Sequence, residues 1–269
     1  EYITFLQEEF LDMIAKEQWV ILPESVALDL QGLRVSPPGV VPQRDRRPRW
    51  ICDFSWAGVN DDTLPLVPLE AMQFGHALER LLREILLADP SLGPVEMLKV
   101  DLSDGFYRVN LNIDDIPKLG VVFPTLPGQE KLIAFPLVLP MGWKNSPPAF
   151  CTATETIADL ANQRLDNGDP PPPHPLDNAA EIAVSRETLP PPRPATSTTP
   201  VAVPLPSDRD PSLPRSPKLL LYIDVFVDDF LALAQGDANR RRVRKVLMHA
   251  IDDVFRPLGA GDNPARREP

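Results

Sequence analysis

Two adjacent aspartates near the end of the sequence, Asp228 and Asp229, are the residues whose placement most strongly suggests chemistry. They stand between two apolar, strand-like segments, 219–226 and 230–234, with almost no spacer, so we expect them at the tip of a hairpin. Neighbouring carboxylates repel each other and resist ionisation unless a cation shares them. Oxygen ligands without nearby His or Cys suit a hard cation such as Mg²⁺. Taken alone, an acidic pair of this kind is more often a solvated turn.

A third carboxylate, Asp101, ends the apolar segment 97–101 and precedes a turn that contains Gly105. An acid at the end of an apolar strand must reach solvent or a positive partner, because burying an unpaired carboxylate is costly. If this strand lies beside the hairpin, three carboxylates converge. Such a cluster can bind two metal ions about 3.5 to 4 Å apart, the arrangement that clamps the attacking and leaving oxygens in phosphoryl transfer.

Four segments stand out along the chain, namely RWICDFS at 49–55 followed by Asn60, DLSDGFY at 101–107, LPMGWKNSP at 139–147 and FVDD at 226–229. In this order they resemble the motifs of reverse transcriptases, especially those of retrotransposons and retroviruses. Four ordered matches are far less probable by accident than any single one. The resemblance implies an α+β fold, the palm and fingers of a right-hand polymerase with an antiparallel palm sheet. It also implies RNA-directed DNA polymerase activity, with an RNA template, a DNA primer and deoxynucleoside triphosphates as partners.

The resemblance also implies a role for each matching residue. Asp101, Asp228 and Asp229 would be catalytic and would hold two Mg²⁺ ions, with Mn²⁺ as a substitute, and the Leu102 carbonyl would join them. The ring of Phe106 would leave no room for a 2′-hydroxyl, although a phenylalanine after a turn can also be a core residue. The expected nucleotide contacts are Arg49, Asp104, Gly105, Phe106 and Met141, and the expected template or primer contacts are Gly142 and Phe226.

The chain departs from the family in two ways. Met141 stands where retroviral enzymes often have Gln, and Phe226 where Tyr is commoner, but neither change removes a metal ligand. The distance between these two residues is much longer than the family usually shows. The surplus coincides with a proline-rich segment, since 15 of the 34 prolines lie between Pro170 and Pro217. We expect 167–217 to be a disordered insertion on the surface, and a ligand for small proline-binding domains is the less favoured alternative.

The remaining pattern alternates between helical and strand periods. We expect 1–166 to be the fingers and the first part of the palm, 218–256 the palm hairpin and its following helix, and 257–269 a tail that ends before a thumb. The expected helices are 3–14, 69–87, 146–165 and 239–255, and the expected further strands are 97–101, 107–111, 120–123 and 132–137.

The net charge of −11 argues against a protein that binds nucleic acid by bulk electrostatics. Two local clusters, the arginines of 44–49 and the basic residues of 240–245, could still provide a basic path. The two cysteines favour a reducing compartment, and no apolar run is long enough to span a membrane, so an intracellular location is expected. The histidines stand in no motif and receive no role.

Two other functions stay open at this point. One is a catalytically silent remnant of a reverse transcriptase that acts as an interaction module through its proline-rich arm. The other is an RNA-templated RNA polymerase, which Phe106 and the 140–147 segment disfavour. The sequence leaves the oligomeric state and the host open.

Overall fold

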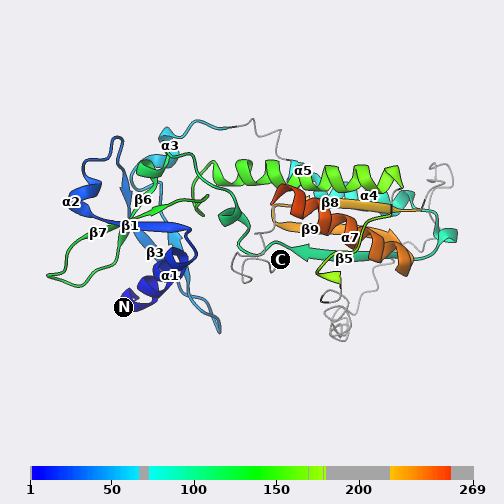
Figure 1. Cartoon of the computed structure of the whole chain (residues 1–269), viewed down its shortest axis with the longest axis horizontal. Helices are drawn as coiled ribbons and strands as arrows, with labels where there is room; N and C mark the ends of the chain where they lie inside the picture. Colours follow the sequence, from blue (N-terminus) through cyan, green and yellow to red (C-terminus); the bar gives the residue numbers. More distant parts are fainter. Residues whose placement is uncertain (1, 67–72, 169, 178, 180–218, 256–269) are drawn as a thin grey trace, which may run out of the picture.

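The structure is a computed structural model, and it describes residues 2–66, 73–168, 170–177, 179 and 219–255 (Figure 1). It contains a four-stranded, a two-stranded and a three-stranded sheet, in which all strand pairs except one are antiparallel. The predicted α+β class is therefore confirmed. Figure 1 shows the first two sheets at one end of the molecule and the three-stranded sheet at the other.

Residues 19–52 and 120–136 supply the strands of the first two sheets. The four-stranded sheet has the order β1-β7-β6-β2, from β1 Trp19–Pro23, β7 Leu132–Pro136, β6 Gly120–Phe123 and β2 Val35–Ser36. The two-stranded sheet pairs β3 Pro38–Val41 with β4 Arg49–Cys52. Short helices connect these strands, namely α2 Glu24–Ala27, α3 Val59–Asp62 and η5 Ile116–Leu119.

An aromatic cluster joins this part together. Phe10 of α1 Ile3–Ala15 lies with its ring centroid 5.5 Å from that of Trp19, 5.2 Å from that of Trp50 and 5.6 Å from that of Phe123. The four rings come from α1, β1, β4 and β6, and they meet edge-on or tilted, as aromatic pairs prefer. The amphipathic period of α1 therefore places Phe10 where it ties both sheets to one core.

The three-stranded sheet has the order β5-β9-β8, from β5 Val95–Asp101, β9 Asp229–Gln235 and β8 Leu221–Phe226. Because side chains alternate along a strand, each face of the sheet presents its own apolar set. Residues such as Ile223 and Phe230 face α5 Ser146–Asn167 and α7 Asp237–Val254, and together they form the main core. The opposite face packs in part against α4 Ala77–Leu87, through Leu81 and Leu233.

An ion pair between Arg80 of α4 and a buried aspartate of β8 holds α4 against this sheet. Arg80 donates to both oxygens of Asp224, at 2.7 and 2.6 Å, and Asp224 is only 3% exposed. The Tyr222 hydroxyl and the backbone N–H of Val225 also donate to this carboxylate. The acid that interrupts the apolar run of β8 is thus fully hydrogen-bonded, as a buried charge must be.

Most predicted elements are confirmed, but two are wrong in part. The segment 107–111 is not a strand: the chain forms a 3-10 helix over Gly105–Arg108, and only Asn110 makes an isolated bridge, to Val138. The turn at Asp104, whose φ is 56°, overrides the apolar pattern of this segment. Of the predicted helix 69–87, residues 69–72 lie outside the described residues, and a 3-10 turn, Gln73–His76, precedes α4. A further 3-10 turn, Pro90–Leu92, follows it.

The start of the proline-rich segment is also not as predicted. Residues 170–177 are described and lie on α7, where His174 Nε2 is 3.0 Å from Asp252 Oδ2 and His249 Nε2 is 3.1 Å from the Pro172 carbonyl oxygen. Lys245 forms an ion pair with Asp177 at 3.0 Å. Two histidines for which no role was predicted therefore hold this stretch against α7. Asn167, the first residue of the predicted insertion, is the last residue of α5. The rest of the predicted insertion, apart from residues 168 and 179, and the tail 257–269 lie outside the described residues.

Among the described helices, none combines the length and the apolar character that crossing a bilayer requires.

Candidate metal centre

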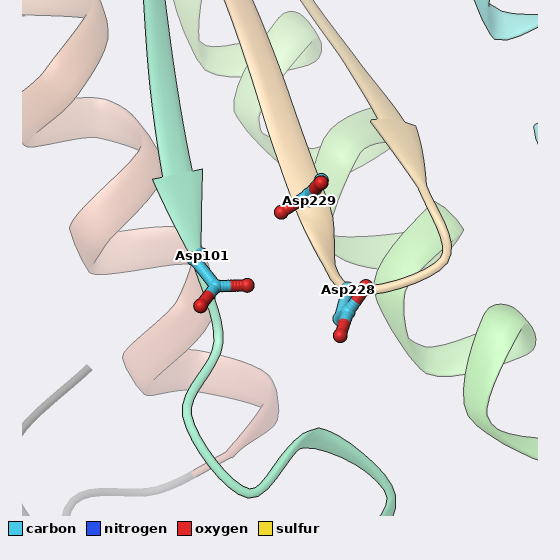
Figure 2. Close-up of side chains that lie close together, drawn as sticks. All are labelled: Asp101, Asp228 and Asp229. Atoms are coloured by element: carbon cyan, nitrogen blue, oxygen red, sulfur yellow. The ribbon is translucent and has the colours of Figure 1, made fainter. Parts of the chain in front are cut away.

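The structure brings the three predicted carboxylates together at one end of the three-stranded sheet. Asp101 is the last residue of β5, Asp229 is the first of β9, and the two are direct partners in the antiparallel register. Asp228 lies in the hairpin turn that precedes Asp229. One carboxylate oxygen from each of the three residues lies within 4.8 Å of the others (Figure 2). Sheet register therefore joins residues that lie far apart in the sequence.

The hairpin turn that carries Asp228 is strained. Phe226 and Asp229 pair with each other, so that Val227 and Asp228 alone form the turn. Val227 has a φ of 61°, a conformation that costs a β-branched residue on the order of 1–3 kcal/mol and that occurs mainly at functional sites. The Leu102 N–H donates to the Asp228 carbonyl oxygen at 3.2 Å, which holds the turn against the end of β5.

The Asp101 carboxylate is affected by its burial and by its acidic neighbours. Partial burial is the largest cause that raises the pKa of Asp101, and the Asp229 and Asp228 carboxylates raise it further. Lys99 partly offsets this repulsion, because its Nζ lies 2.8 Å from Asp229 Oδ2. The hydrogen bond to Asp229 is in turn the main cause that raises the pKa of Lys99. Sequence reasoning missed Lys99, although its position two residues before Asp101 places both on one face of a strand.

The turn after β5 presses closely against the acids. A Cβ atom on Gly105 would lie 2.9 Å from Phe150 Cζ and 3.5 Å from Asp228 Cβ, so only glycine fits here without a shift. Phe106 follows this glycine, is partly buried, and packs on Phe150 with ring centroids 4.9 Å apart. Phe106 therefore borders the acids and also contacts the core. Its position is compatible both with exclusion of a 2′-hydroxyl and with the role of a core residue. Asp104 is exposed and lies 3.8 Å from Lys16.

The expected nucleotide contacts Arg49 and Met141 lie next to each other. Arg49 Nη2 is 3.3 Å from Met141 Sδ, and both side chains are exposed. Phe226 is 49% exposed and its ring meets Phe74 edge-on, with centroids 5.6 Å apart.

Gly142 lies where the loop 140–145 touches β4. Its φ is 95°, and a Cβ atom there would lie 2.6 Å from the Cys52 carbonyl oxygen. Asn60 fastens the same loop from the other side: its amide donates to the Gly142 carbonyl at 3.0 Å and accepts from the Lys144 N–H at 2.9 Å. Asn60 thus positions the predicted template contact, a role that its place in the motif alone did not reveal.

The second basic cluster does not form the open basic path that the sequence suggested. Arg240 pairs with Glu96 and with Asp237, Arg241 pairs with Asp237, and Lys245 pairs with Asp177. Arg242 donates to the Leu165 carbonyl, and Arg244 is only 4% exposed. Except for Arg241, which is 55% exposed, these side chains are at least partly buried, and their charges are engaged by neighbouring residues of the fold. In the first cluster, Arg47 pairs with Glu9 at 2.6 Å, whereas Arg44 and Arg46 are exposed.

No protein-family model matches this chain, and none of the curated proteins matches it either.

Proposed function

We propose that this chain is the palm and fingers of a reverse transcriptase, an RNA-directed DNA polymerase of a retrotransposon that adds deoxynucleotides to a primer 3′-end. The observation that carries the proposal is the convergence of Asp101 with Asp228 and Asp229, which come from two separate motifs. A solvated turn explains an acidic pair, but it does not explain a third acid aligned with the pair by strand register. The strained Val227 is a second sign of a functional site.

The donor set fits Mg²⁺. All three side chains offer carboxylate oxygens, and neither His nor Cys belongs to the group. Hard cations prefer such ligands, and Mn²⁺ accepts them as well. Two such ions, when bound, would supply activation of the primer 3′-hydroxyl and charge compensation for the pyrophosphate leaving group. Asp101, Asp228 and Asp229 would hold the ions, and the Leu102 carbonyl would join them.

The protein's own residues would position the nucleotide. The backbone N–H groups of Asp104 and Gly105 would approach the triphosphate, since the missing Cβ of Gly105 keeps this turn close to the acids. Arg49 would neutralise the triphosphate by charge-assisted hydrogen bonds, beside Met141. Phe106 would exclude the 2′-hydroxyl of a ribonucleotide. Positioning and charge compensation make up most of the catalysis of phosphoryl transfer.

Template and primer would lie along the exposed face beside the acids. Gly142 would let the backbone approach the template-nucleotide pair, and Asn60 would hold its loop against β4. Phe226 would contact the primer end, next to the turn that carries Asp228.

The test is primer extension on an RNA template with Mg²⁺ and deoxynucleotides, comparing the chain with its Asp228→Asn variant. Asp114→Asn is the matched control, because Asp114 is an exposed acid outside the triad. We expect extension by the unchanged chain and by Asp114→Asn, and its loss in Asp228→Asn. A folded, template-binding chain that extends no primer would refute the proposed activity and favour the silent interaction module. Preferential use of ribonucleotides would favour the RNA polymerase alternative.

A further inference from the structure

Lys99 is placed at the acid triad by the geometry of the sheet. It precedes Asp101 by two residues on β5, so both side chains lie on the same face. Lys99 pairs with Leu231 across the ladder, whereas Asp101 pairs with Asp229. Asp229 is therefore the diagonal neighbour of Lys99, at a separation that a long side chain can bridge.

The ammonium group of Lys99 contacts the triad directly. Its Nζ lies 2.8 Å from Asp229 Oδ2, an ion-pair distance, while the Lys99 side chain remains 56% exposed. All three triad carboxylates lie close enough to act on its charge. The positive charge of Lys99 thus lies beside three negative ones, on the side of the sheet where a divalent cation would bind.

We propose that Lys99 is a resident counter-cation of the triad, which stabilises the three carboxylates in the metal-free protein and competes with divalent cations for Asp229. This inference rests on the proposed function, since it assumes that the triad holds metal ions. An incoming cation repels the ammonium group and needs the oxygen that Lys99 contacts, so Lys99 must move aside. The competition lowers the metal affinity of the free protein. Binding then depends more on phosphate oxygens that arrive with the nucleotide, as is usual for Mg²⁺.

The size of the effect follows from Coulomb's law. A unit positive charge about 5 Å from a bound divalent ion lowers the affinity of the triad for that ion on the order of tenfold, if the dielectric constant is that of water. Water-like screening is appropriate because Lys99 is mostly exposed. Removing the charge should therefore tighten metal binding by about that factor.

The experiment measures Mn²⁺ binding at neutral pH by the electron paramagnetic resonance signal of the free ion, for the full chain and for Lys99→Met. Lys118→Met is a closely matched control. The Lys118 Nζ also lies 2.8 Å from an aspartate oxygen, that of Asp115, with 49% and 31% of the two side chains exposed against 56% and 29% for Lys99 and Asp229. We expect Lys99→Met to bind Mn²⁺ roughly tenfold more tightly, and Lys118→Met and Lys99→Arg to bind it as the unchanged chain does.

Thermal unfolding gives a second readout that does not depend on activity. Without divalent ions, Lys99→Met should melt below the unchanged chain, and added Mg²⁺ should raise its melting temperature more than that of the unchanged chain. If folded Lys99→Met binds Mn²⁺ as tightly as the unchanged chain or more weakly, the proposed competition between Lys99 and divalent cations is refuted. If neither the unchanged chain nor Lys99→Met binds Mn²⁺ while both are folded, the metal centre itself fails, and the proposed function fails with it.

Discussion

Substitution of Gly142 by alanine tests how closely the loop 140–145 must fit against β4. The added Cβ would lie 2.6 Å from the Cys52 carbonyl oxygen, a backbone atom that moves only if β4 moves. The residue also has a φ of 95°, which disfavours any side chain. To relieve the clash the loop must shift away from β4, and this shift would break the two hydrogen bonds that Asn60 makes to it.

The expected loss of stability has two parts. The unfavourable φ costs about 1 kcal/mol, and the two hydrogen bonds contribute about 1 kcal/mol each, so we expect Gly142→Ala to lose about 3 kcal/mol. Gly128→Ala is the matched control, because Gly128 has a similar φ of 85° but no atom within 4 Å of its added Cβ. That variant should lose only the part due to φ, about 1 kcal/mol.

Urea denaturation of both variants, followed at equilibrium, measures the difference. We expect Gly142→Ala to unfold at clearly lower urea concentration than Gly128→Ala, and only Gly142→Ala to lose primer extension under conditions where both are folded. Equal losses of stability in the two variants would refute the idea that contact with Cys52 determines the position of this loop.

Three further predictions concern the acids and their surroundings. Because the pKa of Asp101 is raised above its usual 3.8 in the folded chain, the stability of the metal-free protein falls as the pH rises from 3.8 to that raised value, and the whole loss persists at higher pH. Asp101→Asn should therefore raise the melting temperature at neutral pH by about 1–2 °C, with no gain at pH values where Asp101 is protonated in both states, as calorimetry would show. Phe106→Ala should increase the use of ribonucleotides relative to deoxynucleotides by at least about tenfold in single-nucleotide incorporation, and an unchanged ratio would leave Phe106 as a core residue alone. Arg80→Ala should lose about 3 kcal/mol in urea denaturation because Asp224 stays buried without its cation, and a loss below about 1 kcal/mol would contradict this.

The acids could be predicted from the sequence because each stands at the end of an apolar segment with a strong strand pattern. Asp101 ends β5, and Asp228 and Asp229 stand between two such segments, so the site follows once the strands are neighbours. Lys99 could not be assigned to the site in the same way. Its contact with Asp229 depends on the register between β5 and β9, which are far apart in the sequence and which no local pattern aligns.

The misjudged elements show where local pattern fails. The apolar residues near Tyr107 fit a strand period, but the left-handed Asp104 and the following glycine turn the chain into a 3-10 helix. In α4, Leu81 is buried against the sheet, whereas Leu78 and Leu82 of the same predicted helix are 68% and 51% exposed. The ion pair between Arg80 and the buried Asp224 fixes the rotation that turns Leu81 toward the sheet.

The first sheet was predicted only in part, for a related reason. Strands β6 and β7 were predicted from their apolar runs, whereas β1 and β2, which pair with segments far away in the sequence, were not. Trp19, for example, pairs with Pro136. Similarly, the ordered stretch before residue 178 depends on the contact of His174 with Asp252, which proline content alone does not reveal.

The most direct test of the central claim is a crystal structure of the chain soaked with Mn²⁺ and measured at a wavelength where manganese scatters anomalously. We expect an anomalous peak among the carboxylates of Asp101, Asp228 and Asp229, and a second peak about 3.5 to 4 Å away when a deoxynucleoside triphosphate is present. Crystals of the Asp228→Asn variant should lose or weaken this signal. A folded chain whose anomalous peaks lie elsewhere, with none at the triad, would contradict the claim that these acids form a metal centre.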